Sequence, residues 1–142
     1  MIFDATFIKR IAIGGVLAGL LVVGGLYWYG YNAAQRIKTS RKDAQRILSF
    51  ITTGHPEIAY TFATKSLQGK LSKADFIAKL GPLSAKVPNF YPGKLDDTGS
   101  ALTYTQKVDK LTAGANGKTE AIFTLQLVDD NGWKLDNIVV KQ

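Results

Sequence analysis

The hydrophobic pattern is dominated by an uncharged run of 21 residues, 11–31, near the N-terminus. An α-helix rises about 1.5 Å per residue, so this run would measure about 31 Å, close to the hydrocarbon thickness of a bilayer. A helix buried in a soluble core would rarely continue so far without a polar face. The pattern therefore predicts a transmembrane helix over residues 11–31, preceded by a short tail of residues 1–10.

Charged and aromatic residues flank this run in the way they flank membrane segments. Tyr and Trp prefer the level of the lipid headgroups, and Lys and Arg are attracted to anionic lipids. We therefore expect headgroup contacts from Lys9, Arg10, Tyr27, Trp28, Tyr29, Tyr31, Arg36, Lys38, Arg41 and Lys42. Bulky rings occupy the positions at which signal peptidase requires small residues, so we expect the segment to be retained as a signal anchor.

Two rules disagree about the side of the membrane on which the rest of the chain lies. Two cations precede the run and four come after it, which by the positive-inside rule would leave the C-terminal region in the cytoplasm. A short N-terminal tail ending in Lys9 and Arg10 is instead the usual layout of an anchor that exports the C-terminal region. We favour export, partly because of a family resemblance in that region.

Small residues recur at helical spacing within the run. They are Gly14, Gly15, Ala18, Gly19 and Gly25. Such residues allow two helix backbones to approach closely, and membrane helices associate through such contacts. The pattern predicts a membrane protein partner or a second copy of the chain, although Gly is also common in membrane helices that have no partner.

The periodicity changes to that of short amphipathic helices over residues 33–80. A helix is predicted over 33–53, with Ile37, Ala44, Ile47, Leu48 and Ile51 on its apolar side. Two shorter helices are predicted over 57–64 and 73–80. Ser72 and Asp75 have the spacing of a capping box at the start of the last helix, and Gly81 and Pro82 end it.

Residues 81–100 contain Pro and Gly and are predicted to form a loop or an edge strand, after which polar and apolar residues alternate as in strands. The predicted strands are 101–111, 119–128 and 133–140, joined by turns at 113–118 and 129–132. In the last strand Trp133, Leu135 and Val139 should share one face. Helices followed by an antiparallel meander indicate an α+β domain over residues 32–142, with two or three helices packed on a sheet of three to four strands over 101–140.

This region contains four short motifs, which are the Gly54 turn, the Ala59-Tyr60 helix start, the Ser72/Asp75/Phe76 helix and the ending Asp129-Asp-Asn-Gly-Trp-Lys-Leu-Asp136. Together they resemble the nuclear-transport-factor-2-like (cystatin-like) α+β superfamily. The resemblance covers residues 40–142 and implies a small cone-shaped domain, which in many bacterial members is exported behind one anchor. Enzymatic branches of this family place an Asp or His pair inside the cone, whereas the inward positions here are Leu, Tyr, Phe and Trp. The resemblance therefore implies a fold and leaves activity open.

Two other groups of proteins share parts of this layout. Small single-span assembly factors of respiratory complexes resemble the chain in the anchor and in a terminal Gly-Trp-x-Leu strand, here Gly132 to Leu135. Scaffold subunits of type IV secretion systems combine one spanning helix with an α+β domain but are longer.

The net charge of +7 raises the question of nucleic-acid binding. Residues 1–42 carry six cations and one acid, or +5, whereas residues 43–142 carry twelve cations and ten acids, or +2. The basic excess thus flanks the apolar run, while a nucleic-acid-binding domain would carry it as a stripe on its own surface. Membrane lipids, and no nucleic acid, are the expected partners of these charges.

The residues offer little chemistry of the kind that active sites need. There is no Cys, and the one histidine, His55, stands before Pro56 in a predicted turn where a cap or solvent contact is expected. Asp129 and Asp130 begin a sequence that faintly resembles a calcium loop, but position twelve is Val140 in place of the required Glu. We predict no catalytic residue, no metal site and no cofactor.

Aromatic residues are the remaining candidates for a binding site. Tyr60, Phe62, Phe76, Tyr104, Phe123 and Trp133 could fill the core or line an apolar pocket between helices and sheet. The segment Phe90-Tyr91-Pro92 is expected to be exposed and is a candidate contact patch.

Together these features favour a single-pass membrane protein with a non-enzymatic, protein-binding domain, acting as an accessory or scaffold subunit of a membrane assembly. One alternative is a small-ligand carrier or enzyme that uses an apolar cavity. A second alternative is a pilin-like filament subunit, which would assemble through its N-terminal helix.

Overall fold

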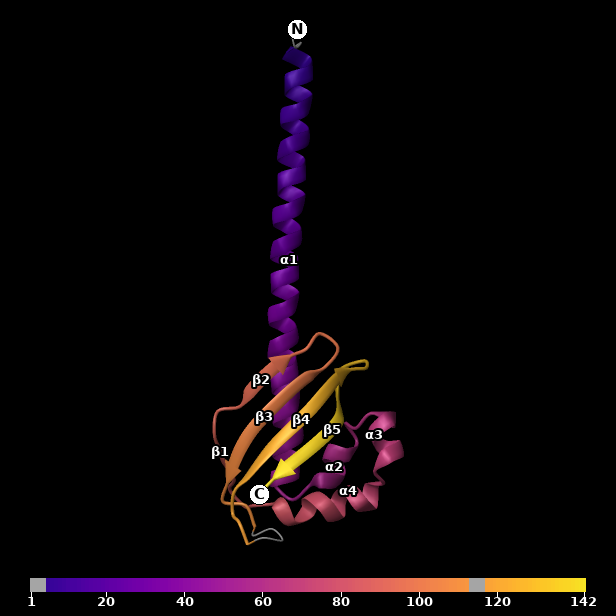
Figure 1. Cartoon of the computed structure of the whole chain (residues 1–142), viewed down its shortest axis with the longest axis vertical. Coiled ribbons are helices and arrows are strands. Elements are labelled where there is room, and N and C mark those ends of the chain that lie inside the picture. Colours follow the sequence, from indigo (N-terminus) through magenta and orange to yellow (C-terminus); the bar gives the residue numbers. More distant parts are fainter. Residues whose placement is uncertain (1–4, 113–116) are drawn as a thin grey trace. The chain divides into compact units, whose positions relative to one another are not determined.

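The computed structural model describes residues 5–112 and 117–142 and contains two compact units, Met1–Arg36 and Ile37–Gln142. Helix α1, Ala5–Thr52, extends through the first unit and supplies the first element of the second (Figure 1). The helices predicted over 11–31 and 33–53 are therefore parts of one element. No Pro and no polar turn sequence interrupts residues 11–52, so nothing in the local chemistry ends the helix earlier.

The apolar part of α1 is exposed in the first unit. Within the helix Ile8–Thr52, the most apolar window of 18 residues has a mean hydropathy of 2.0, and none of its residues is buried. Leu20, Leu21 and Trp28 are 64%, 77% and 69% exposed. A helix of this length and composition can cross a membrane, a property that signal anchors and signal sequences share.

The second unit begins with the amphipathic end of α1, whose apolar side is buried. Ala44, Ile47, Leu48 and Ile51 are fully buried, as their spacing predicted, whereas Ile37 is 41% exposed. The helix ends at Thr52, and Gly54 follows with a positive φ of 87°, a conformation that glycine adopts without strain.

Three short α-helices and a 3₁₀ turn come after α1. They are α2 (Pro56–Tyr60), α3 (Lys65–Lys70), α4 (Lys73–Leu80) and η1 (Gly81–Leu83). The single helix predicted over 57–64 was wrong in its extent: α2 ends at Tyr60, and the prediction omitted α3. The cause is tertiary, because Leu135 of the sheet bonds Phe62 O and Thr64 N and holds this segment out of a helix.

The predicted bounds of the 73–80 helix agree with α4. Asp75 N donates to Ser72 Oγ at 3.2 Å, and the Ser72 hydroxyl donates to Asp75 Oδ2 at 2.8 Å. The Ser72 side chain thus caps the helix as predicted, whereas the Asp75 carboxylate accepts from the Ser72 hydroxyl in place of the Ser72 backbone N–H of a full capping box.

The remaining elements form one antiparallel sheet of five strands. They are β1 (Asn89–Phe90), β2 (Lys94–Asp97), β3 (Leu102–Asp109), β4 (Ala121–Asp129) and β5 (Trp133–Lys141). The order is β1-β3-β4-β5, and β2 also pairs with β3. The fold class is α+β, as predicted, with more strands than expected because both β1 and β2 lie in the segment predicted as a loop or an edge strand over 81–100.

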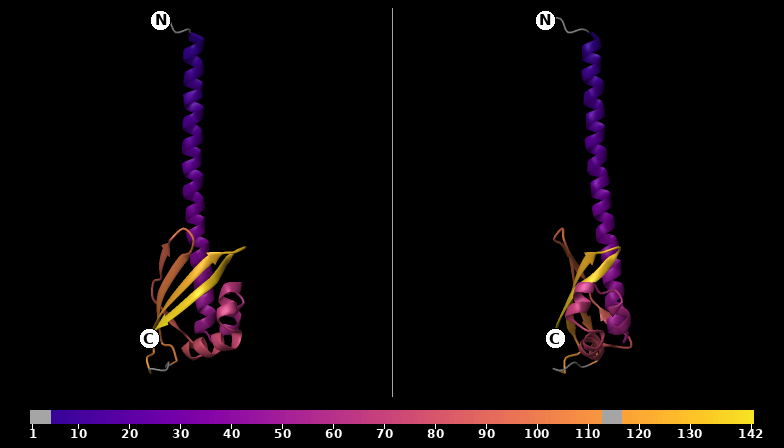
Figure 2. Two further views of the ribbon diagram at one scale, coloured as in Figure 1. Left: turned by 45° about the vertical axis from the view of Figure 1, so that its right-hand side comes forward. Right: turned by 90° about the vertical axis from the view of Figure 1, so that its right-hand side faces the viewer.

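One face of the sheet is covered by the helices of the second unit and the other is open (Figure 2). Residues of β3 alternate between buried and half-buried, which matches one covered and one solvated face. The core between the layers includes Phe76, Leu80, Tyr104, Phe123 and Leu125, all fully buried.

The prediction for the last strand was wrong at one position. Val139 is 44% exposed, whereas Ile138 is 4% exposed and belongs to the core. The register shifts between Gln126 and Leu127 of β4, so that Leu127 pairs with Leu135 but Gln126 pairs with Asn137. This β-bulge inserts one residue into β5 and reverses the side on which the later side chains of the strand lie.

The turn predicted at 129–132 is present, with positive φ angles of 54° at Asn131 and 110° at Gly132. Of the turn predicted at 113–118, residues 113–116 lie outside the described part of the chain, and Gly117 has a φ of 67°. Residues 1–4 of the predicted tail also lie outside it.

Candidate functional site

The small residues of α1 have no packing partner within their own chain. Gly14, Gly15, Ala18, Gly19 and Gly25 are exposed. A Cβ added at any of these four glycines would meet no atom within 4 Å, apart from the neighbouring backbone of α1 itself. Contacts within the described residues therefore do not account for the small size of these side chains.

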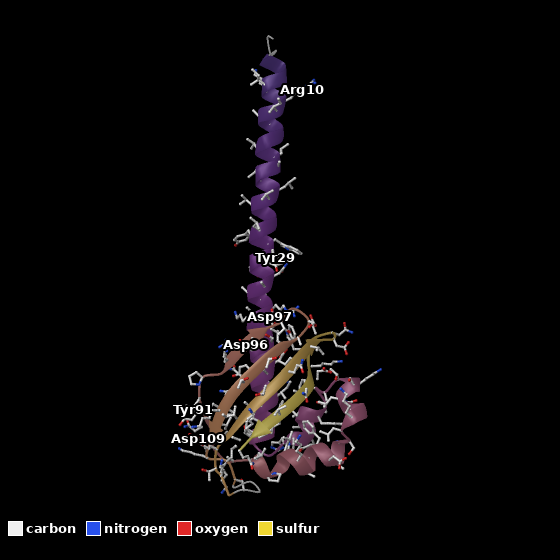
Figure 3. All side chains as sticks on the ribbon, in the orientation of Figure 1. Arg10, Tyr29, Tyr91, Asp96, Asp97 and Asp109 are labelled. Atoms are coloured by element: carbon white, nitrogen blue, oxygen red, sulfur yellow. The ribbon has the colours of Figure 1, made fainter. Side chains whose placement is uncertain are left out.

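The residues predicted to contact headgroups are mostly exposed. Tyr27, Trp28, Tyr29 and Tyr31 are between 55% and 77% exposed, and Arg10 and Tyr29 are labelled in Figure 3. The cations Lys9, Arg10, Lys38, Arg41 and Lys42 are also exposed, whereas Arg36 is half-buried. The headgroup contacts themselves stay a prediction.

The aromatic candidates lie in the layer between helices and sheet, where they fill space. Phe76, Tyr104 and Phe123 are fully buried, and Trp133 is 7% exposed. Tyr60 and Phe62 are partly buried against this core. The structure thus places all six candidates in or against the core.

Hydrogen bonds and ring contacts hold these aromatic side chains in place. Trp133 Nε1 donates to Thr39 Oγ1 at 3.2 Å, and the Tyr60 hydroxyl donates to Leu71 O at 2.8 Å. The Tyr60 and Phe76 ring centroids are 5.2 Å apart. Polar atoms of these rings are therefore satisfied by structural partners.

A buried polar network, absent from the sequence-based prediction, attaches the 90–93 segment to β3. The Tyr104 hydroxyl donates to Gln106 Oε1 at 2.6 Å, and Gln106 Nε2 donates to Tyr91 O. Gln106 is 6% exposed. Its position within the apolar alternation Leu102, Tyr104, Val108 is the signal that could have revealed it, because a polar residue in a core position needs a partner.

A recess of about 220 Å³ opens beside this network. Gln45 and Ser49 of α1 line one side, and Phe90 and Gln106 of the sheet line the other. Phe90 and Tyr91 are each 41% exposed, in agreement with the exposure predicted for this segment. The recess has the volume of one large side chain or a small ligand.

His55 is exposed at the start of α2. Its Nδ1 lies 3.2 Å from Glu57 Oε1. A hydrogen bond from the backbone N–H of Glu57 and a second one from His55 lower the pKa of the Glu57 carboxyl. His55 occupies the N-cap position of α2 without a side-chain capping hydrogen bond, and its exposed ring agrees with the solvent-facing alternative expected from the sequence.

The acidic pairs serve turns and neighbouring lysines. Asp97 Oδ1 accepts from Gly99 N at 2.8 Å, and Asp129 Oδ1 accepts from Gly132 N at 3.3 Å. Asp96 pairs with Lys94 at 3.5 Å. Within residues 5–112 and 117–142, no three His, Asp or Glu side chains are grouped as metal ligands.

A cluster of charged groups occupies the end of the open sheet face near Tyr91 and Asp109 (Figure 3). Lys107 Nζ lies 3.0 Å from Glu120 Oε2, 3.9 Å from Asp109 Oδ1 and 5.0 Å from the centroid of the Tyr91 ring. The hydrogen bond to Glu120 raises the pKa of Lys107. Hydrogen bonding to the Asp109 carboxylate raises the pKa of the Tyr91 phenol.

Comparisons of the chain with protein-family models, curated proteins and solved structures found no match.

Proposed function

We propose that this chain is a single-pass membrane protein whose α+β domain binds protein and serves as an accessory or scaffold subunit of a membrane assembly. The observation that carries the proposal is the exposure of the apolar helix. Side chains such as Leu20 and Leu21, more than 60% exposed, would be unfavourable in water along the whole length of the run. A bilayer removes that cost, and it also suits the aromatic and basic residues at the ends of the run.

The packing of the domain supports a binding role over an enzymatic one. An enzymatic cone needs polar groups that converge in a cavity. Here Phe76, Tyr104 and Phe123 occupy the interior with full burial, and the hydroxyl of Tyr104 is bonded to Gln106. The resemblance to the nuclear-transport-factor-2-like superfamily is part of this proposal and implies the same exported, anchored arrangement.

The open face of the sheet is the surface on which we expect the protein partner to bind. Strand register places Thr105, Thr124 and Val139 in one row across β3, β4 and β5. Ile122 and Val139 are 42% and 44% exposed on this face. Exposed aliphatic side chains with polar residues around them match the apolar centre and polar rim of a protein–protein interface.

Tethering would be the mechanism. Attachment to a spanning helix confines the domain to the neighbourhood of the membrane, which raises its effective concentration for membrane partners without any new contact. The small residues of α1, led by Gly15 and Gly19, would add a helix partner within the bilayer or a second copy of the chain. We place the domain on the extracytoplasmic side.

Site-specific photo-crosslinking of the full chain in its native membranes tests the proposal. A crosslinker at Val139 should yield a discrete adduct with a membrane protein, because this residue lies on the open face. The control is a crosslinker at Lys79, which is exposed on α4 and should yield no adduct. Replacing Ile122 by Asp should abolish the Val139 adduct. A chain that fractionates with the soluble proteins, or that remains monomeric and without adducts, would contradict the proposal.

The recess beside Phe90 favours a second candidate function, the binding of a small ligand. Its volume of about 220 Å³ and its lining of Phe90, Gln45 and Ser49 would accept a compact apolar molecule with one polar group. This function predicts that a ligand raises the melting temperature of the full chain and that Ser49→Phe, which would fill the recess, removes the effect.

A further inference from the structure

A second recess, of about 260 Å³, lies at one end of the open sheet face. Strand register sets Lys107 and Lys141 directly opposite Ile122, one from each neighbouring strand. Lys118, Glu120 and Gln142, the last residue of the sequence, are also in the lining. The side chain of Ile122 thus lies among three lysines and one glutamate.

Within the described part of the chain, two of the three lysines of this recess lack the ion pairs that other lysines of the sheet form. Lys94 pairs with Asp96 and Lys134 pairs with Asp130, each at 3.5 Å. Lys107 pairs with Glu120 at 3.0 Å, so these two charges cancel within the recess. Two lysines of the recess, Lys118 and Lys141, pair with no carboxylate among residues 5–112 and 117–142.

No acidic residue close in sequence is left over to pair with them. Residues 113–116, which precede Lys118, are Ala-Gly-Ala-Asn and contain no carboxylate side chain. Lys118 and Lys141 therefore line one recess and form no ion pair with the residues that the structure describes. Like charges held in a concave site raise the local concentration of counter-ions.

We propose that this recess binds the phosphate monoester of a small organic molecule. A phosphate monoester carries a charge of about −1.5 to −2 at neutral pH, which matches the two unpaired lysines. Lys binds phosphate as a point charge through short, charge-assisted hydrogen bonds. The side chain of Ile122 and the lysine stems would contact the organic part.

This inference does not rest on the protein-binding role, and the two proposed surfaces share one residue, Ile122, while Val139 lies outside the recess. The same phosphate chemistry could come from a soluble metabolite or from a lipid with a monoester headgroup. Two sets of probes separate these sources. The soluble probes are phenyl phosphate and inorganic phosphate, and the lipid probe is a phosphatidylcholine vesicle with or without phosphatidic acid.

The experiment is a calorimetric titration of the full chain in neutral detergent, with ionic strength held constant by chloride. Phenyl phosphate should bind more tightly than inorganic phosphate, since only the ester covers Ile122. Lys118→Gln and Lys141→Gln should each weaken binding about tenfold, the loss of one charge-assisted contact. The matched control is Lys134→Gln, which removes a lysine of the same sheet face that is already paired and should change affinity less than twofold.

Each result decides the question. Failure of phenyl phosphate to bind at about 10 mM, or equal binding by wild type and both variants, would overturn the site. Equal affinity for the two soluble probes would overturn the assignment to an organic ester. Flotation with phosphatidic acid vesicles that is lost in both variants would support the site and assign it to lipid, whereas flotation that both variants retain would count against it.

Discussion

At the scale of single residues, Tyr104 and its neighbours illustrate how one buried polar group determines several others. A Cβ placed at Gly93 would lie 2.1 Å from the Tyr104 hydroxyl oxygen, so only glycine permits this close approach. The hydroxyl then reaches Gln106, which in turn bonds the backbone of Tyr91. A buried amide without such partners would be costly, so the three groups depend on one another.

The Tyr91 phenol should titrate above its ordinary pKa of 10.0 because it shares a hydrogen bond with the Asp109 carboxylate. Replacing Asp109 by Asn removes the negative charge and should return the pKa towards 10.0. Ring resonances of isotope-labelled tyrosine, followed against pH by nuclear magnetic resonance, would measure both values. Asp96→Asn is the control, since Asp96 pairs with Lys94 and is not among the groups that shift Tyr91.

The sign of the linked stability is set by the direction of this shift. A raised pKa in the folded state means that the folded protein holds the phenolic proton more firmly than the unfolded chain does. The contribution is therefore complete below the ordinary pKa of 10.0 and is lost as pH rises through the folded value. Unfolding curves of wild type and Asp109→Asn should converge in that alkaline range, and a constant separation would contradict the assignment.

At the scale of elements, the helices differ in how much of their definition is local. Helix α4 is capped at its start by the side chain of Ser72, the residue before it, and at its end by Gly81. The capping sequence and the apolar spacing were therefore enough to predict this helix. Helix α3 is capped by Thr64, whose hydroxyl accepts from Leu67 N at 3.1 Å and donates to Asp136 Oδ1 at 2.8 Å. Half of that arrangement comes from a strand 72 residues away along the chain.

These two caps predict different losses of stability. Ser72→Ala removes an exposed cap and should lower the free energy of unfolding by about 1 kcal/mol. Thr64→Ala removes a cap and a tertiary hydrogen bond at a residue only 6% exposed, and should cost about 2 kcal/mol. Guanidinium unfolding of the full chain in detergent would measure both. Ser66→Ala, at an exposed position inside α3, should have little effect, and an equal cost for all three would contradict this account of the caps.

The strands show the same division between local and long-range causes. The alternation of polar and apolar residues along β3 and β4 agrees with their buried sides, because period two is a local property of an extended chain. Strands β1 and β2 are too short and polar to produce a pattern, and they exist because β3 offers backbone partners. The bulge opposite Gln126 and Leu127 likewise leaves no pattern in the sequence. Because of this bulge Ile138 is buried in the core, where Val139 had been predicted.

At the scale of the whole molecule, the apolar run is the feature with the largest consequence for function. Over residues 11–31 it has the length of a bilayer span, and its side chains are exposed in the structure. By contrast, the domain of residues 37–142 buries most of its large apolar side chains in one core around Phe76, Tyr104 and Phe123. The second unit thus removes its apolar side chains from water by its own fold. The apolar side chains of the first unit would leave water only in a bilayer or against another protein.

Charges placed in the middle of the run should release the chain from the membrane. Arg at a helix centre costs about 2.5 to 3.5 kcal/mol on the insertion scale, so the double change Leu20→Arg and Val23→Arg should make the chain extractable by alkaline carbonate. The matched control, Leu20→Ile with Val23→Leu, preserves hydropathy and should remain in the membrane pellet. Retention of the double-Arg variant, or a mature chain that begins after residue 31, would contradict a retained anchor.

The sequence by itself determined the apolar span, the α+β order, the capped helix 73–80 and the buried sides of β3 and β4, because length, spacing and capping act between residues close along the chain. Only the tertiary structure decided the short strands β1 and β2, the bulge in β5, the start of α3 and the bond from Gln106 to Tyr91. The same holds for the recess in which Lys107, Lys118 and Lys141 meet. Each of these depends on contacts between distant segments, and such contacts form only when the sheet brings those segments together.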